Sequence, residues 1–598
     1  MFIMQKLIEG LELIVRDLGG DFVPVVEVPT DLRHGDFTSN AAMVLGKALR
    51  RNPLALAEEI RGKFEEKGVA MVERVEAVRP GFVNFWLSED YLYSEVDRLI
   101  QMDGVRVSSS LSGKRVLIEY GHPNTHKEMH IGHMRTLITG EALARILSAG
   151  GAKVFRANYQ GDIGPHVAKA LYGVERMLAE KALKLGDLTG WTDRARARFL
   201  GEAYVRGNKD YEIEKNKIDG INKQLYDGDG NTPKPSIAGE EGNPDVQKIE
   251  ELYRETRQWS LDYYDDFYAR FYTKFDRLFF ESEMVESGKR IVLANVGKVF
   301  EMDNGAVVFK GEKYGLHTRV FITQAGYPTY EGKEMACAFS EVEAFAFDIK
   351  MHVVANEQAG YFRVVFKALE LLDQERFEGK QYHVSMGMVQ LSDRKMSSRT
   401  GDVLTVDWLI DEVKSRVGRF ITEQNVSREE AALIGEQITI GAIKYSVLKV
   451  GTGVTAAFDI EKSVSLTGNS GPYLQYTYAR TQSVLRKAAV SEVSGLLRHV
   501  HLHERGLAMT MDREELDLLR MLVRFEDVVR GAAERYSPNV IANYLFELAQ
   551  AFNLFYQKLP ILKEGTEVRE FRLGLTVAVG KVMRLGLDLL GIKAPERM

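Results

Sequence analysis

The chain has 598 residues, of which 45% are hydrophobic and 27% charged, and its formal net charge is −6. This length exceeds what one hydrophobic core supports, so three or four domains are expected. The acidic balance excludes a chain-wide basic surface for nucleic acid, although a local basic groove stays possible. A single cysteine, Cys337, excludes an intrachain disulfide and a cysteine-based zinc site. No run approaches twenty apolar residues and the first twenty residues include acids, so we expect a cytoplasmic protein with no membrane span and no signal peptide.

Residues 1–108 predict a small α/β domain. The first twenty residues place apolar side chains at helical spacing, and Pro53 marks the start of a later helix. Residues 72–88 alternate apolar and polar residues around a Pro-Gly turn, which indicates a β-hairpin. The polar run at 107–115 predicts a linker to the next domain.

Residues 109–460 predict an α/β domain built on a parallel sheet. Strand, loop and helix follow one another twice, with the strands at 115–120 and 153–159. The charged stretch at 190–280 predicts a helical insertion, and we assign no role to its acidic, Gly/Pro-rich loop at 227–245. The sheet is expected to resume with strands at 306–311, 350–356 and 382–391. From 461 to 598 apolar residues recur at helical spacing, which predicts an all-helical bundle.

The stretch HPNTHKEMHIGH, residues 122–133, contains His122, His126, His130 and His133 at spacings of four, four and three. A helical metal site is one interpretation, but a proline and a glycine interrupt the stripe and a strand directly precedes it. A polar loop with incidental histidines is another. In the third, His130 and His133 open the first helix after the first strand, where imidazoles hydrogen-bond phosphate oxygens and Gly132 allows close approach. None of these assigns a firm role to His122 or His126.

The pair HIGH (130–133) and KMSSR (395–399), in this order and after strands, resembles the signature of class I aminoacyl-tRNA synthetases. Further stretches resemble the arginyl-tRNA synthetase family in particular, from about residue 35 to the end, with the acidic insertion matching least. They are GDFTSN (35–40), EYGHPNTHKEMHIGHMRT (119–136), NYQGDIG (158–164), FFESEMVESG (279–288), PTYEGKEMACA (328–338), NEQAGYF (356–362), GNSGPYLQYTYAR (468–480) and LLGIKAPERM (589–598).

The resemblance implies a Rossmann-type catalytic domain, an N-terminal domain that contacts the tRNA elbow, and a helical anticodon-binding domain. It implies a monomeric ligase that activates L-arginine with ATP and Mg²⁺, needs tRNA(Arg) for activation, and holds no structural metal. ATP-binding positions would be His130, Gly132, His133, Gly161, Asp162, Lys395 and Ser397, and the segment around Gly387 could pass the adenine. A tRNA-binding protein without catalysis, another class I synthetase and a metal-dependent hydrolase are the competing interpretations.

One departure from the general motif concerns its second lysine, which Ser398 replaces here. The resemblance implies that Lys127, three residues before the HIGH motif, supplies the missing charge, since a flexible ammonium can reach phosphates from either loop. The catalytic set would then be Lys127, His130, His133 and Lys395. A solvated loop lysine is the alternative for Lys127.

A guanidinium calls for planar carboxylate partners. The resemblance places the arginine site at Asn124, Glu281, Tyr330, Glu334 and Gln358, with Glu334 where many relatives have Asp. On spacing alone, Tyr330 and Glu334 could equally be one exposed helix face. Tyr473, Tyr476 and Arg480 are candidates for tRNA contact, although aromatic residues in a helical bundle usually belong to its core.

Overall fold

The computed structural model describes residues 3–29, 31–227, 244–392, 404–419, 427–488 and 511–598. The N-terminal unit is a four-stranded antiparallel sheet in the order β1-β2-β4-β3, with three helices packed on it. The predicted hairpin is confirmed, and so is the helix start at Pro53, where the Asn52 side chain accepts hydrogen bonds from two backbone amides. The elements are α1 (Ile3–Asp17), β1 (Val26–Glu27), η1 (Leu32–His34), β2 (Phe37–Ser39), α2 (Ala41–Leu49), α3 (Pro53–Lys67), β3 (Val72–Val78) and β4 (Phe82–Leu87).

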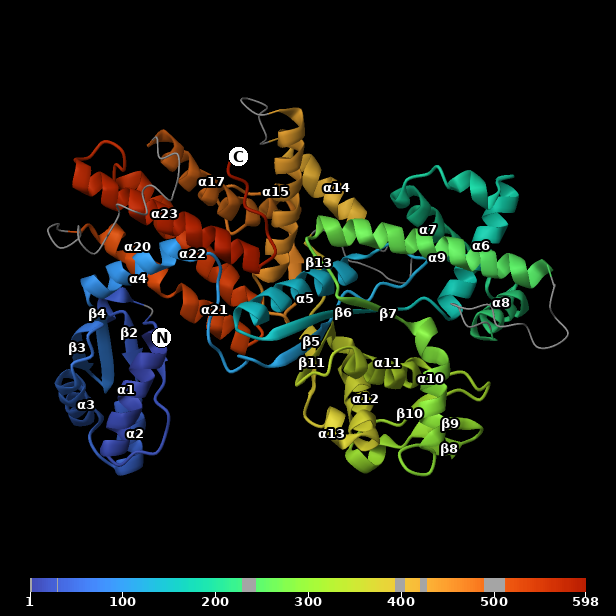
Figure 1. Ribbon diagram of the computed structural model, residues 1–598, viewed down its shortest axis with the longest axis horizontal. Coiled ribbons are helices and arrows are strands. Elements are labelled where there is room, and N and C mark those ends of the chain that lie inside the picture. Colours follow the sequence, from blue (N-terminus) through green and yellow to red (C-terminus); the bar gives the residue numbers. More distant parts are fainter. Residues whose placement is uncertain (1–2, 30, 228–243, 393–403, 420–426, 489–510) are drawn as a thin grey trace.

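The centre of the molecule is a parallel sheet in the order β12-β11-β5-β6-β7 (Figure 1). Alternate residues of β5 face two separate cores, because side chains of a strand point to opposite faces. Val116 and Ile118 pack in the core shared with α5 and the C-terminal helices, whereas Leu117 packs in the core of α10, α11 and α12. The elements are β5 (Arg115–Glu119), α5 (Ile131–Ala149), β6 (Lys153–Gln160), α6 (Pro165–Glu180), β7 (Arg277–Phe280), α10 (Glu281–Ala294), α11 (Tyr330–Ala344), β11 (Ile349–Ala355), η4 (Asn356–Gln358), α12 (Ala359–Leu372), α13 (Gln374–Phe377) and β12 (Gln381–Met386).

The structure adds one strand that was not predicted and corrects two that were. The fifth strand of the sheet, β7, lies inside the stretch predicted to be insertion, where its four residues are flanked by charged helices. The predicted strand at 306–311 pairs instead in a separate antiparallel sheet, β10-β9-β8, formed by β8 (Glu301–Asp303), β9 (Ala306–Phe309), η3 (Gly311–Tyr314) and β10 (Arg319–Ile322). The predicted strand at 382–391 divides at Gly387, where a Cβ would lie 2.5 Å from the backbone of Val454. Its second part, β13 (Val389–Leu391), pairs with β14 (Ala456–Phe458).

The insertion is helical, as predicted, and consists of η2 (Leu185–Leu188), α7 (Asp193–Asp210), α8 (Lys215–Asp227) and α9 (Pro244–Arg270). The loop predicted at 227–245 lies almost entirely outside the described residues. Helix α9 runs from the insertion back along the catalytic domain toward α14 (Figure 1). It contributes Tyr263, Tyr264 and Phe267 to the main core, so the insertion and the sheet are joined by one continuous helix.

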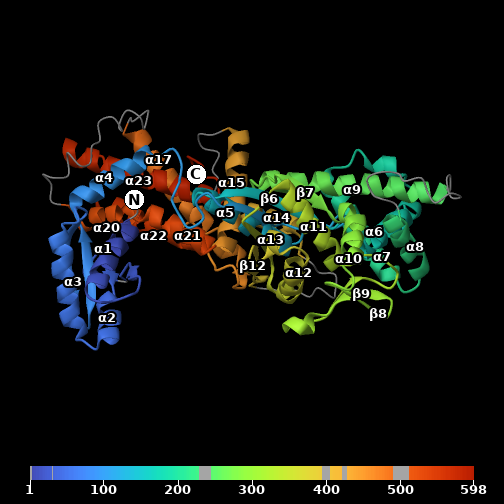
Figure 2. The same cartoon turned by 60° about the horizontal axis from the view of Figure 1, so that its bottom comes forward.

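The C-terminal domain is a helical bundle, as predicted, and the N-terminal unit packs against it (Figure 2). Helix α4 (Glu89–Gln101) contacts α20 and α23, and the buried carboxylate of Asp36 lies 2.6 Å from the guanidinium of Arg520. The remaining elements are α14 (Val406–Val417), α15 (Arg428–Leu448), α16 (Ile460–Ser463), α17 (Gly471–Lys487), α20 (Arg513–Val523), α21 (Phe525–Glu534), α22 (Pro538–Lys558) and α23 (Thr566–Leu589). Among the described residues, no helix has the length and apolar character needed to span a membrane.

Helices α6 and α7 pack backbone to backbone, which predicts the effect of one substitution. A Cβ at Gly173 would lie 1.9 Å from the carbonyl oxygen of Ala203, and this backbone atom cannot move aside cheaply. We therefore expect Gly173→Ala to separate the two helices and to raise hydrogen–deuterium exchange in both.

The matched control is Gly62→Ala in α3, where the added Cβ meets open space. Alanine favours a helix over glycine by about 1 kcal/mol, so exchange in α3 should slow or stay unchanged. Wild-type exchange in α6 and α7 of Gly173→Ala would contradict the prediction.

Candidate functional site

A cavity of about 520 Å³ opens at the carboxyl edge of the parallel sheet, where the chain order switches direction between β5 and β11. Ligands of open α/β sheets bind at this place, because the strand order leaves a crevice there. The lining residues come from the ends of β5, β11 and β12, from the start of α5 and from the chain before α14. They are Gly121, His122, His130, Ile131, Gly132, His133, Arg135, Thr136, Val354, Ala355, Glu357, Gln358, Met386, Gly387, Met388, Val389 and Leu404.

His130 caps helix α5, and this cap determines which of its two ring nitrogens carries the proton. Its Nδ1 accepts the backbone amides of Gly132 (3.1 Å) and His133 (3.4 Å), so two of the free N–H groups expected at this helix start are already bonded. A neutral imidazole carries one proton, which therefore resides on Nε2 of His130. Burial, with Lys127 nearby, lowers the pKa of His130 to about 4, so the ring is a neutral donor at neutral pH.

The ring of His133 stacks on that of His130, with centroids 3.6 Å apart. Burial and the neighbouring His130 lower the pKa of His133 well below its ordinary value. Both rings line the cavity, as the phosphate interpretation requires. They can therefore serve phosphate oxygens through hydrogen bonds rather than through positive charge.

The other two histidines of the stretch, His122 and His126, lie apart from this pair. His122 lines the cavity with its Nδ1 3.5 Å from Oε1 of Glu119, whereas His126 is completely buried against helix α9. Within the described parts of the chain, the two clusters with metal-ligand spacing are Glu119, Glu334, His352 and Glu119, Cys337, Glu341, and neither includes a histidine of the stretch 122–133. The stripe of four histidines is therefore not a metal site in this fold.

Lys127 lies half-buried beside the two stacked rings. Its backbone carbonyl accepts the Tyr264 hydroxyl at 3.0 Å, and its ammonium lies over the ring of Tyr204, 4.2 Å from the centroid. Burial and the nearby Lys169 lower the pKa of Lys127. The insertion thus contacts this lysine twice, through α9 at the backbone and through α7 at the ammonium.

Asn124, Gly161 and Glu281 come together at the ends of β5 and β6 and the start of α10. A Cβ at Gly161 would lie 2.2 Å from Oδ1 of Asn124 and 3.4 Å from Oε1 of Glu281, so a glycine is required here. Asp162 lies next to this group but outside the cavity lining. Its buried carboxylate accepts hydrogen bonds from the Ser282 amide (2.9 Å) and the Arg257 guanidinium (2.8 Å), a structural junction of β6, α9 and α10.

Four buried carboxylates surround the proposed arginine side of the site, and two buried lysines hold three of them. Lys333 pairs with Glu281, and Lys350 hydrogen-bonds Glu341 and lies 2.9 Å from Glu119. Burial opposes the charge of Lys350, but its three glutamate neighbours raise its pKa well above the ordinary value. The ammonium groups of Lys333 and Lys350 therefore occupy the positions between the carboxylates at which a metal ion could otherwise bind.

The fourth carboxylate, Glu334, has only a long ion pair with Lys350. Its Oε1 is buried without a hydrogen-bond partner among the described residues, and the nearest cation, Lys350, lies 3.8 Å away. Burial, together with the charge of Glu119, raises the pKa of Glu334 to about 8. A buried carboxylate in this condition is suited to receive a cationic ligand group.

Sequence reasoning missed Glu119, Lys333 and Lys350. A signal was present for two of them, because Glu119 and Lys350 are charged residues in otherwise apolar strands. Tyr330 and Gln358 lie at the edge of the site. Tyr330 is 56% exposed with its ring 4.9 Å from the Lys333 ammonium, and Gln358 lines the cavity beside Glu357.

Lys395, Ser397 and Ser398 lie outside the described residues. The chain that follows them returns to the HIGH segment: the Leu404 carbonyl accepts the Ile131 amide (3.3 Å), and the Val406 amide donates to the carbonyl before that motif (2.9 Å). The chain directly after the second half of the signature is therefore hydrogen-bonded to the first half, although the two lie far apart in the sequence.

The residues predicted to contact tRNA lie on α17. Tyr473 and Tyr476 are half-buried, and Arg480 lies over the rings of Tyr476 (4.7 Å) and Tyr556 (5.1 Å). The neighbouring Tyr478 is a core residue. An exposed edge of stacked aromatic and guanidinium groups is compatible with base stacking.

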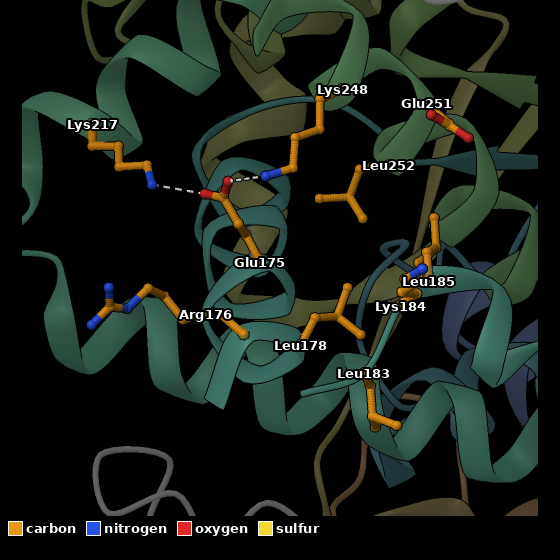
Figure 3. Close-up of a pocket in the computed structure, with 11 residues that line it drawn as sticks. Glu175, Arg176, Leu178, Leu183, Lys184, Leu185, Lys217, Lys248, Glu251 and Leu252 are labelled. Carbon is orange, nitrogen blue, oxygen red and sulfur yellow. Dashed lines mark hydrogen bonds and ion pairs between the residues drawn. The ribbon is translucent and has the colours of Figure 1, made fainter. Parts of the chain in front are cut away.

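A second cavity lies between helix α6 and the insertion (Figure 3). Four leucines form part of its wall, and the ammonium groups of Lys217 and Lys248 each lie 2.7 Å from the Glu175 carboxylate. These charges are closely paired to one another, in contrast to Glu334, whose contact with Lys350 is 3.8 Å long.

Three family models match the chain in order. They describe an arginyl-tRNA synthetase N-terminal domain (residues 4–87), a class I tRNA synthetase (R) catalytic domain (95–454) and a DALR anticodon-binding domain (474–598). The arginine–tRNA ligase of Bacteroides thetaiotaomicron is 31% identical over 619 residues, covering 100% of both chains. That of Treponema denticola is 30% identical, covering 96% of this chain and 94% of the relative.

Solved structures share the fold. The arginyl-tRNA synthetase of Thermus thermophilus superimposes with a TM-score of 0.79 at 24% identity and covers 100% of both chains. That of Plasmodium falciparum superimposes with a TM-score of 0.78 at 19% identity, covering 100% of this chain and 99% of that one.

Proposed function

The chain belongs to the arginyl-tRNA synthetase family and is an arginine–tRNA ligase, and we propose that arginine and ATP react in the cavity at the carboxyl edge of its parallel sheet. The observation that carries this assignment is the combination of two unlike features: neutral imidazoles that line the cavity at a helix start, and a buried carboxylate outside the lining, Glu334, that has only a long contact with Lys350 (3.8 Å). Phosphates suit the first and a guanidinium suits the second.

The proposed reaction has two steps. An oxygen of the arginine carboxylate bonds to the α-phosphorus of ATP as the bond to the pyrophosphate oxygen breaks, which gives arginyl-adenylate. The terminal ribose 2′-hydroxyl of tRNA(Arg) then attacks the adenylate carbonyl, loses its proton, and AMP leaves. Neither step needs a protein nucleophile, so the protein acts by positioning and by offsetting charge.

We assign ATP contacts to His130, Gly132 and His133, with Lys395 and Ser397 proposed from the sequence alone. The Nε2–H of His130 is the available donor, since Nδ1 is occupied by backbone amides. The segment Met386–Val389, with Gly387, lines the opposite wall and is our candidate for contact with adenine. Gly161 and Asp162 lie outside the cavity lining, and we propose that Gly161 acts through its close approach to Asn124 and Asp162 through its contacts with α9 and α10.

Lys127 is proposed as the catalytic cation that compensates for Ser398. It is the lysine next to the two imidazoles, and both of their pKa values respond to its charge. An ammonium that rests on an aromatic ring keeps its charge without a carboxylate that would neutralise it. Such a group can move to a phosphate by a change of side-chain torsion alone.

Glu334 is proposed as the main guanidinium partner, with Glu281 and Tyr330 flanking it and Asn124 and Gln358 toward the amino acid backbone. Lys333 and Lys350 lie close to the other carboxylates, whereas Glu334 has only a 3.8 Å contact with Lys350 and would ionise when the guanidinium binds.

The remaining parts of the proposal concern the metal ion, the tRNA contacts, the location of the protein and its oligomeric state. We propose that Mg²⁺ arrives with the ATP phosphates, because the described cavity lining contains a single carboxylate, Glu357, and this cation usually keeps water and phosphate oxygens as ligands. Tyr473, Tyr476 and Arg480 are proposed to stack on bases of tRNA(Arg), and the N-terminal unit to contact the tRNA elbow. We propose a cytoplasmic monomer, since one chain carries all three domains.

The first prediction tests the reaction itself. The purified chain should catalyse ATP–pyrophosphate exchange with arginine alone among the twenty amino acids, and total tRNA should be required for full exchange. Exchange is measured as incorporation of labelled pyrophosphate into ATP. Absence of exchange by folded protein with arginine and tRNA present would contradict the assignment.

The second prediction concerns Lys127. Replacement by methionine removes the charge and keeps the chain length, so kcat should fall about 100-fold or more, while KM for ATP and arginine changes only a few-fold. Steady-state aminoacylation kinetics separate the two effects. Lys169→Met, which removes a neighbouring charge from α6, is the matched control and should stay near wild type; near-normal kcat in Lys127→Met would refute the compensation.

The third prediction concerns pH. Arginine needs the ionised form of Glu334, whose pKa is raised to about 8, so binding should release a proton at pH 7. Affinity should therefore rise as pH increases from about 6.5 to 8.5, by at most about tenfold per pH unit for one proton. Calorimetry in buffers of different ionisation enthalpy measures the released proton.

The control is Glu334→Gln, which keeps the shape but removes the titrating group. It should weaken arginine binding by about 100-fold and abolish the pH dependence together with the proton release. If Glu334→Gln retained the slope of the wild type, another group would be responsible.

A further inference from the structure

His126 has no role in the proposed chemistry, yet both of its ring nitrogens and its backbone amide make hydrogen bonds. The side chain is fully buried, and its backbone adopts the left-handed region with φ +63°. For a residue with a Cβ this conformation is unfavourable and persists only when the surroundings enforce it. Two of the three hydrogen bonds come from helix α9, more than a hundred residues away in the chain.

The partners of His126 fix its tautomer. Its backbone amide donates to Oγ of Ser260 (2.9 Å), its Nδ1 contacts Oγ1 of Thr125 (2.9 Å), and its Nε2 contacts Oγ1 of Thr256 (2.9 Å). The Thr256 hydroxyl already donates its proton to the Leu252 carbonyl (2.6 Å), so Nε2 of His126 must be the donor to Thr256. Nδ1 is then the acceptor of the Thr125 hydroxyl.

The environment keeps this tautomer neutral. Burial, with the neighbouring His166 and the positive charge of Arg257, lowers the pKa of His126 to about 3. Tyr253 of α9 lies nearly parallel to the imidazole, 6.2 Å between centroids, and adds to the enclosure. The ring is therefore a fixed connector with one donor and one acceptor.

The same helix holds the residues on both sides of His126. The Tyr264 hydroxyl lies 2.5 Å from the carbonyl oxygen of Asn124 and 3.0 Å from that of Lys127. Helix α9 thus fixes residues 124, 126 and 127 through Thr256, Ser260 and Tyr264, which share one helix face at i, i+4 and i+8. The loop has no helix or strand in this stretch, and apart from these contacts its backbone is held by the Thr125 amide, which donates to the Gly161 carbonyl (3.0 Å).

We propose that His126 is a positioning residue that clamps the loop to α9 and thereby sets where Lys127 and Asn124 face the substrates. The inference rests on the catalytic role proposed for Lys127. The carbonyl groups are bound by Tyr264 whether or not His126 is present, but the left-handed turn between them is held by the His126 ring and amide. Loss of the clamp allows this turn to relax and moves the Lys127 Cα away from its place.

The test uses Thr256, which lies outside the cavity lining. Thr256→Val removes the acceptor of His126 with little change in shape, whereas Thr256→Ser retains it. Thr256→Val should lower kcat for ATP–pyrophosphate exchange about tenfold with unchanged KM for ATP, and Thr256→Ser should restore it. Ser260→Ala, which removes the acceptor of the His126 amide, should act in the same direction if Thr256→Val fails to fold.

Combination with Lys127→Met separates positioning from a general loss of structure. When Lys127 is absent there is no ammonium left to misplace, so adding Thr256→Val should lower kcat less than about twofold further. An equal tenfold loss in both backgrounds would overturn the inference while leaving the role of Lys127 intact. Near-normal kcat in Lys127→Met alone would instead overturn the proposed function, and this inference with it.

Discussion

The buried ammonium of Lys350 holds together the parts from which the substrate site is built. It lies on β11, 2.9 Å from Glu119 at the end of β5, and it hydrogen-bonds Glu341 of α11. An uncompensated ammonium in this interior would be costly, and so would the carboxylates without it. The two strands at the switch point and the helix that carries Glu334 are therefore tied to one another by one charge, and Glu334 is the carboxyl group of this cluster without a close cation.

Burial has a second consequence at the phosphate side of the cavity. Burial lowers the pKa of His130 and of His133, so neither supplies positive charge at neutral pH. In the proposed reaction, the positive charge that the protein itself offers to the phosphates therefore comes from lysines, in addition to the charge of Mg²⁺. This requirement explains why a change at Ser398 bears on Lys127: with imidazoles limited to hydrogen bonding, the number of nearby ammonium groups sets how much charge can be offset.

Local patterns predicted much of the fold, including the hairpin around Pro80, the helix start at Pro53 and the first two parallel strands. They failed where a strand is defined by its partner. Residues 277–280 form a sheet strand because β6 pairs with them, and residues 306–309 leave the main sheet because β8 and β10 pair with them. The site shows the same division: the helix start at His130 was visible locally, whereas Lys350 and His126 acquire their roles from partners that are remote in the sequence.

Helix α9 connects the features described above, because it contacts both the catalytic loop and the C-terminal helices. Its middle binds the loop of Asn124 to Lys127, while at its C-terminal end Arg270 lies 2.9 Å from Glu436 of α15. The next carbonyl, of Phe271, accepts a hydrogen bond from the buried Lys444, which also donates to the Gly591 carbonyl (2.7 Å) at the close of the helical bundle. A rigid helix transmits displacement along its length, so the position of the anticodon-binding domain and that of the catalytic loop are tied to the same 27-residue element.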